Sequence, residues 1–428
     1  MPANQLSSCN IVRSTLRIRD IMSESFLNNA PIVARQAIFD TDLNVYAYEL
    51  LFRSNNKQID SGVIDSFGDE ATSRVINHTF MELGIERVIG NHLAFVNLTR
   101  KFILTDDPLP FARDRVVLEI LEDIVADDEL IAATQKLVDQ GYIIALDDFI
   151  FDESLRPLVQ LAEIIKIDLL AHSDQTLKAQ VRLLKQENVK LLAEKVETQQ
   201  QFELCKKLGF DYFQGYFFSR PTIIEGRAIP DSQLNLLSII TKLQDSDAEL
   251  DDIEQLISQD IALTYKLLRL LNSASMALPR QIDSIKQGLI ILGLKAIKTW
   301  TTLIALNDMK SIPSELMANT LIRAKMCEHL ASHYNCSAET GFLVGLFSTI
   351  DAMMSHPMDK PLKSLPLNND IKEALTGGQG SLGELLKVVI QYEHGLWDEV
   401  STEQVSLEQL SKFYINATEW TIETQPSL

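Results

Sequence analysis

The stretch IIALDDF, residues 143–149, indicates the fold of the first half of the chain. Its four apolar residues are typical of a buried strand, and two adjacent aspartates follow at the strand end. Other apolar runs also lead into a polar side chain at or near their ends: YAYELLFR (46–53), LAFVNLT (93–99), VVLEILE (116–122), IIKIDL (164–169), LLAEKVE (191–197) and YFQGYFF (212–218). Helix-like stretches separate most of them, so the sequence predicts a parallel sheet closed into a βα barrel.

The polar residues at these strand ends predict a metal site. A βα barrel gathers the carboxyl ends of its strands at one mouth, where crowded carboxylates repel one another and raise each other's pKa. A divalent cation relieves that repulsion, and oxygen ligands suit Mg²⁺, Mn²⁺ or Ca²⁺. Adjacent aspartates can each face a different ion, as two-metal hydrolysis requires. The expected ligands are Glu49, Asn97, Glu119, Asp147, Asp148 and Glu194.

Each of these residues also has an ordinary structural explanation. Asp148 alone could be a helix N-cap, and Lys166 could be an ion-pair partner of Asp168 or Glu163. Gln214 could be a hydrogen-bonding residue at the barrel mouth. Taken together at successive strand ends, the carboxylates have no structural purpose, so we favour the functional interpretation. Lys166 could then hold a hydrolytic water, and Arg53 could grip a phosphate oxygen.

Composition narrows the function classes. The chain has 428 residues, enough for two or three domains. Its formal net charge is -20, which disfavours nonspecific binding to nucleic acid or to an anionic membrane. The four cysteines show no C-x-x-C spacing, and we see neither a signal peptide nor an eighteen-residue apolar span. We therefore expect a cytoplasmic protein without membrane insertion.

The second half of the chain has a different period. After residue 222, apolar residues recur at three- and four-residue spacing, as in SIKQGLIILGLKAIKTWTTLIAL (284–306), which predicts packed amphipathic helices. We therefore expect a poorly ordered extension over 1–30, a barrel over 31–222, a helical domain over 223–415 and a tail over 416–428.

The first half resembles the EAL family of cyclic di-GMP phosphodiesterases, with many motifs in register between Pro31 and Pro221. The signature Glu-Ala-Leu appears as Glu49-Leu50-Leu51, followed by Arg53. The resemblance implies a TIM-like barrel that cuts cyclic di-GMP to linear pGpG with two Mg²⁺ or Mn²⁺ ions. It implies the following roles: metal ligation by Glu49, Asn97, Glu119, Asp147, Asp148 and Glu194; water orientation by Lys166; substrate binding by Leu51, Arg53 and Gln214; and anchoring of the loop after Asp148 by Glu122. Asp148, Lys166 and Glu194 are thereby the expected catalytic residues.

Two departures from this family bear on activity. Active members continue the aspartate pair with a Gly-Thr-Gly loop, whereas this chain has Ile150-Phe151-Asp152. Lys195 replaces a family glycine. Loss of glycine removes access to positive φ and close backbone approach, and a displaced supporting shell costs rate. Hydrolysis, and binding of cyclic di-GMP or a protein partner without turnover, therefore both stay open. EAL barrels often pair through this region, so a homodimer is also open.

The second half resembles the HDOD domain, on SQDIAL (258–263), KLLRLLNSA (266–274) and the predicted helix 285–294. Metal-dependent relatives need a His-Asp pair, but Ser348 and Thr349 stand in what looks like its place. His329 and His333 lack an obvious third ligand. We expect this domain to bind a protein partner, with Asn272 and Ser273 capping or bridging helices. We expect no nucleic-acid binding, because no basic, aromatic-interleaved stripe is visible.

Overall fold

The computed structural model describes residues 32–53, 84–105, 109, 111–121, 124–215, 239, 242–243, 249–272, 281–307, 313–354, 356–365 and 367–425. Several predictions fall on residues outside these ranges. They are the N-terminal extension, the domain boundary at residue 222, the loop anchor Glu122, and Ser273. The side chain of Arg53 also lies outside the described part of the structure.

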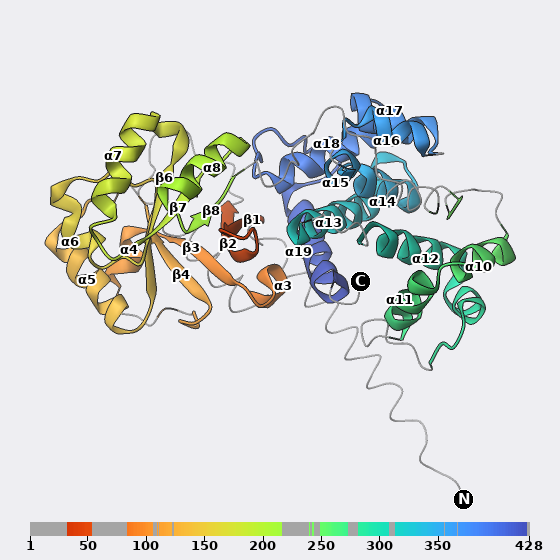
Figure 1. Cartoon of the computed structure of the whole chain (residues 1–428), viewed down its shortest axis with the longest axis horizontal. Coiled ribbons are helices and arrows are strands. Elements are labelled where there is room, and N and C mark those ends of the chain that lie inside the picture. The colour runs from red at the N-terminus through yellow and green to blue at the C-terminus, as the bar shows by residue number, and fades with distance from the viewer. Residues whose placement is uncertain are drawn as a thin grey trace, which may run out of the picture.

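The N-terminal domain is a closed eight-stranded barrel, shown in red to green in Figure 1. Its strands follow one another around the barrel in chain order: β1 (Ile32–Asp40), β2 (Val45–Arg53), β3 (Leu93–Leu98), β4 (Val116–Ile120), β5 (Ile143–Leu146), β6 (Ile164–Asp168), β7 (Lys190–Glu194) and β8 (Tyr212–Phe213). Neighbours from β2 to β8 are parallel, as predicted. The barrel fold is therefore confirmed.

β1 departs from the sequence prediction. It was not among the predicted strands, and it runs antiparallel to both β2 and β8. Its sequence IVARQAIFD carries Arg35 and Gln36 between its two apolar runs, which interrupts a buried-strand pattern. A tight turn joins β1 directly to β2, in place of the helix that a parallel crossover requires. The described sheet is therefore mixed.

Two apolar layers hold the barrel together. Inside it, side chains from all eight strands form one small cluster that includes Phe95, Val117 and Leu192. Outside it, the opposite strand faces pack under helices in a larger cluster. Those helices are α3 (Glu86–Ile89), α4 (Arg100–Leu104), α5 (Asp128–Asp139), α6 (Arg156–Val159), α7 (Asp174–Leu184) and α8 (Gln199–Leu208). The alternation of strand side chains between two apolar layers leaves the strand ends free for polar groups.

The C-terminal domain is helical, as predicted, and occupies the green-to-blue part of Figure 1. Its described helices are α10 (Leu250–Ser258), α11 (Ile261–Leu271), α12 (Ile285–Asn307), α13 (Ser314–Leu330), α14 (Ala338–Phe347), α15 (Ile350–Met354), α16 (Asp359–Ser364), α17 (Asn369–Gly377), α18 (Gly380–Glu393) and α19 (Leu407–Thr424). Among the described residues, no single helix is long and apolar enough to cross a membrane; only the two halves of α12 taken together pass that test, and they are bent by 114°.

The predicted tail from residue 416 is wrong. That segment is the second half of α19, which packs against α13 and against β1 and α3 of the barrel. It looked polar in sequence because of its threonines. Thr418 and Thr421 are nevertheless buried, since each hydroxyl donates to the carbonyl four residues earlier in the helix. The helical domain therefore contacts the barrel through its final helix.

Candidate active site

A buried lysine lies at the centre of the barrel mouth. Lys166 Nζ, on β6, lies 2.7 Å from Glu119 Oε1 and 2.7 Å from Asp147 Oδ1. It is also 3.0 Å from Glu194 Oε1 and 3.5 Å from Glu49 Oε2. Lys166 and Glu119 are fully buried, and Glu49 and Glu194 nearly so. Four of the predicted metal ligands therefore surround one ammonium group.

Strand register brings these residues together. Asn97 on β3 lies beside Glu119 on β4, and Asp147 directly follows β5. Glu194 ends β7, the strand that pairs with β6. The alternatives considered for Lys166 are not what the structure shows, because Glu163 pairs with Lys190 and Asp168 with Lys195. The parallel register thus converts residues scattered over the sequence into one cluster.

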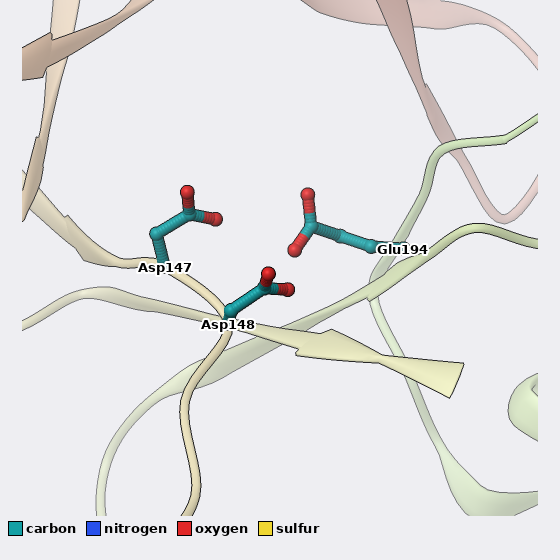
Figure 2. Close-up of side chains that lie close together, drawn as sticks. All are labelled: Asp147, Asp148 and Glu194. Carbon is teal, nitrogen blue, oxygen red and sulfur yellow. The ribbon is translucent and has the colours of Figure 1, made fainter. Parts of the chain in front are cut away.

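Several oxygen atoms in this cluster lack partners. Among the described residues of the mouth, the buried oxygens that accept no hydrogen bond include Asn97 Oδ1, Glu119 Oε2, Asp148 Oδ1, Glu194 Oε2 and Gln214 Oε1. Unpaired buried oxygens are unfavourable, so such a group calls for a further donor or a cation. Ligand atoms of Asp147, Asp148 and Glu194 lie within 4.8 Å of one another, and Figure 2 shows their carboxylates facing a common space. This hard-oxygen set fits a divalent ion such as Mg²⁺ or Mn²⁺.

Burial sets the ionisation of the cluster. It raises the pKa of Glu119 and of Glu194 well above the ordinary value, and the nearby Lys166 offsets this only in part. Burial alone would lower the pKa of Lys166, but the surrounding carboxylates outweigh it and raise that pKa well above its ordinary value. Without a metal ion, Lys166 is therefore charged, while Glu119 and Glu194 readily take up protons.

Gln214 holds Glu49 in place. Its Nε2 donates to Glu49 Oε2 over 2.7 Å, and both side chains are buried. The next residue, Gly215, has a φ of +149°, and a Cβ there would lie 2.3 Å from the backbone nitrogen of Val196. Val196 N also donates to Gln214 O. The end of β8 is therefore fixed against the loop that follows Glu194, and only glycine fits at position 215.

The loop after Asp148 is organised without the family's glycines. Phe149 is buried, and its amide donates to Lys166 O. Phe151 lies edge-on to Phe149, and its amide donates to Gln180 Oε1 on α7 over 3.0 Å. Asp152 then caps a short 3-10 helix by accepting from Ser154 N. Aromatic packing and side-chain hydrogen bonds therefore order this loop, which lacks the Gly-Thr-Gly sequence of the family.

Lys195 adds a second cation beside the aspartate pair. Its Nζ lies 2.6 Å from Asp168 Oδ2 and 3.6 Å from Asp148 Oδ2. Lys195 and Asp148 both have positive φ, at 54° and 39°, which is uncommon for residues other than glycine. Asp148 is therefore not a helix N-cap but a turn residue aimed at the site. In the sequence analysis Lys195 is noted only as the replacement of a glycine. Its position next to Glu194, at an acidic strand end, was the signal that could have predicted its contact with Asp148 and Asp168.

Two other predicted residues lie near the end of β2. Leu51, near the end of β2, packs against the apolar cluster of the helical domain, so its contact with substrate stays a prediction. Arg53 is the last residue of β2, on the strand that carries Glu49, and its phosphate contact likewise stays a prediction.

The polar residues that the sequence analysis singled out in the helical domain make contacts within that domain. Ser348 accepts from Arg323, and Thr349 shares a 2.6 Å hydrogen bond with Thr320. His329 and His333 both lie against the ring of Phe413. Asn272 bridges α11 to the segment before α12, through hydrogen bonds with Leu268 O and with the backbone of Ile282. The bridging role predicted for Asn272 is confirmed.

Comparison with known proteins identifies the family. The model of the EAL domain matches residues 92–221, and that of the HDOD domain matches residues 229–361. The chain is 34% identical over 397 residues to the cyclic di-GMP phosphodiesterase CdgJ of Vibrio cholerae, covering 91% of each chain. The chain belongs to the EAL–HDOD family. The chain is also similar to the protein YuxH of Bacillus subtilis, with 32% identity over 91% of this chain and 97% of that protein's length.

Solved structures with an EAL domain are more distant. That of Bacillus subtilis YkuI, in complex with cyclic di-GMP and calcium, is 20% identical over 56% of this chain and 73% of its own, with a TM-score of 0.38.

Proposed function

We propose that this protein is a divalent-metal-dependent phosphodiesterase that hydrolyses cyclic di-GMP to linear pGpG. The observation that carries the proposal is the complete carboxylate set around Lys166, with buried oxygens left without partners. The likeness to CdgJ over nearly the whole chain supports the choice of substrate. Glu49, Asn97, Glu119 and Asp147 would hold one Mg²⁺ or Mn²⁺ ion, and Asp148 and Glu194 would hold a second with Asp147.

Each group then has a defined task. Bound divalent ions would stabilise charge on the phosphoryl oxygens and favour deprotonation of water. Lys166 would donate a hydrogen bond to the attacking water and stabilise the charge that develops at phosphorus. Gln214 orients Glu49 through its 2.7 Å hydrogen bond. Arg53 would grip a phosphate oxygen of the substrate, and Leu51 would contact it at the end of β2.

A direct assay tests this proposal. Purified protein is incubated with cyclic di-GMP and MnCl₂, and the products are identified by mass spectrometry. We expect pGpG from the native protein, none after EDTA treatment, and none from the Glu49→Gln or Lys166→Met variants. Lys190→Met is a matched control, because its ion pair with Glu163 is half exposed and lies away from the site. Calorimetric titration with Mn²⁺ in the presence of ligand gives the number of ions, for which we expect two.

The second candidate is a cyclic di-GMP receptor without turnover. The pairing of Lys195 with Asp148 favours it, because this ammonium competes with a second metal ion for the carboxylate. Tight binding of cyclic di-GMP by metal-replete protein that releases no pGpG would establish this alternative.

We further propose that the helical domain binds a protein partner and that the protein works in the cytoplasm, as a homodimer where the barrels pair. Pull-down with the full chain, cell fractionation and sedimentation test these points.

A further inference from the structure

The barrel closes through a short seam between β1 and β8. These strands pair at only two positions, Phe39 with Phe213 and Asp40 with Tyr212, whereas β1 pairs with β2 from Ile32 to Phe39. Toward Ile32, the described β1 therefore has a long edge that no described strand covers. Buried backbone groups without partners are strongly unfavourable, so this edge needs other donors and acceptors.

Three hydroxyl groups of the helical domain supply them. Tyr392 on α18 donates to Val33 O over 2.8 Å. Val33 N donates to Ser411 Oγ, and Arg35 N donates to the hydroxyl of Tyr414, both over 3.3 Å. Backbone groups of alternate strand residues face the same side, so these bonds act along one edge in the manner of a neighbouring strand. The helical domain thus supplies partners for three backbone groups along this edge.

Further contacts fasten the same face. On α13, the buried Glu315 accepts a 2.7 Å hydrogen bond from Tyr48, the residue before Glu49 on β2. The guanidinium of Arg35 lies 4.1 Å from the centre of the Tyr48 ring. A cavity of about 150 Å³ lies between the domains, lined by Gln36, Ala37 and Gly215 of the barrel together with helical-domain residues. The seam therefore borders a space between the domains.

The seam is also next to the candidate site. Gly215, which lines the cavity, directly follows Gln214, whose side chain holds Glu49. Backbone bonds of Gln214 tie the end of β8 to Ala193 and Val196, on either side of Glu194. A shift of β8 relative to β1 would therefore move Gln214, and with it Glu49, without any change in the carboxylates themselves.

We propose that Tyr392, Ser411 and Tyr414 are positioning residues, through which the helical domain holds the β1–β8 seam and thereby sets the geometry of Glu49 and Gln214. The helical domain is then part of the barrel's closure, and a partner that moves it changes metal and ligand affinity. This inference rests on the proposed function where metal affinity and turnover are concerned, whereas the effect on the seam, measured by hydrogen exchange, is independent of it.

The test compares the full-length Tyr392→Phe/Tyr414→Phe variant with Tyr142→Phe. Tyr142 is a suitable control, since its buried hydroxyl also donates to a backbone carbonyl, that of Phe111, within the barrel itself. Hydrogen exchange is measured by mass spectrometry on the peptide that covers 212–215, and Mn²⁺ affinity by calorimetry. For the double variant we expect about tenfold faster exchange in that peptide. Val33 O and Arg35 N lose their buried partners, which loosens β1 against β8. We also expect several-fold weaker Mn²⁺ binding, with neither change in the control.

Unchanged exchange over 212–215 in the double variant would overturn the proposal, whatever the enzyme activity. So would faster exchange together with native Mn²⁺ affinity. If the double variant does not fold, Ser411→Ala, which removes one acceptor only, is measured in the same way and judged by the same two readouts. Native protein that makes no pGpG, with both shifts present in the variant, would refute the phosphodiesterase proposal and leave the positioning role standing.

Discussion

Replacing Lys166 by methionine should lower the free energy of unfolding of the metal-free protein and raise its affinity for Mn²⁺. The ammonium lies within 3.5 Å of four carboxylates at the barrel mouth, and its raised pKa keeps it charged at pH 8. Removing one partner of a buried ion pair typically costs about 3–5 kcal/mol, because the other charge stays buried and unpaired. Protonation of Glu119 and Glu194, whose pKa values are raised by burial, limits the loss. We therefore expect the free energy of unfolding to fall by about 3 kcal/mol in EDTA at pH 8.

Bound Mn²⁺ changes this balance. Divalent ions neutralise the same carboxylates, so the loss of the ammonium should lower the stability of the metal-bound protein by only about 1 kcal/mol. By linkage, the difference of about 2 kcal/mol appears as tighter Mn²⁺ binding, which corresponds to roughly 30-fold in affinity. Catalysis should be lost at the same time, since no group remains to hold the attacking water.

The assay is urea unfolding in EDTA and in saturating MnCl₂, with calorimetric Mn²⁺ titration of the native protein and the variant. Lys190→Met is the control; its exposed ion pair with Glu163 should contribute less than about 1 kcal/mol and leave Mn²⁺ affinity unchanged. Mn²⁺ affinity that is unchanged or weaker in Lys166→Met would refute the reasoning, because it would show that lysine and metal do not share the same carboxylates.

Four further predictions concern the same mouth. Mn²⁺ binding should release protons and tighten from about pH 5 to pH 8, because the raised pKa values of Glu119 and Glu194 mean that both must lose a proton; calorimetry in buffers of different ionisation enthalpy measures this, and buffer-independent heats would contradict it. Without metal, the same raised pKa values should make the protein more stable as the pH falls toward 4.5 and less stable as it rises. Gly215→Ala should lower the free energy of unfolding by about 1–3 kcal/mol or more, since its Cβ would lie 2.3 Å from Val196 N; a native urea midpoint would show that the loop can yield. Lys195→Gly should tighten Mn²⁺ binding several-fold with a stability change within about 1 kcal/mol, because the ammonium beside Asp148 is half exposed; equal affinity would separate Lys195 from the metal site.

The sequence predicted the barrel and its carboxylates because both follow from local patterns. Each of β2 to β7 is a short apolar run, and the parallel register alone brings Glu119, Asp147 and Glu194 together around Lys166. Nothing about their clustering required knowledge of the second domain. The site residues could therefore be placed from strand ends, before any comparison of structures.

What the sequence did not predict depends on contacts between the domains. β1 was missed because Arg35 interrupts its apolar pattern, and this arginine is buried only where Tyr48, Tyr414 and Glu315 surround it. Only the second half of α19 was mistaken for a tail; its threonines look polar in sequence, but their hydroxyls bond within the helix. Periodicity reports the face that a segment buries against apolar neighbours, but not a polar face that a distant domain satisfies.

The charges at the mouth connect the metal count with the substrate. Six carboxylates, those of Glu49, Glu119, Asp147, Asp148, Asp168 and Glu194, face two ammonium groups, Lys166 and Lys195, which leaves four formal negative charges when all are ionised. One divalent ion still leaves the mouth negative, and it would repel a dinucleotide that carries two phosphodiester charges. Two ions make it neutral, which removes the repulsion of that ligand. Lys195 lowers the affinity of the mouth for the second ion, whereas a bound dinucleotide raises it, so ligand and second metal should bind cooperatively. An enzyme built in this way holds its second ion firmly only when the substrate is present.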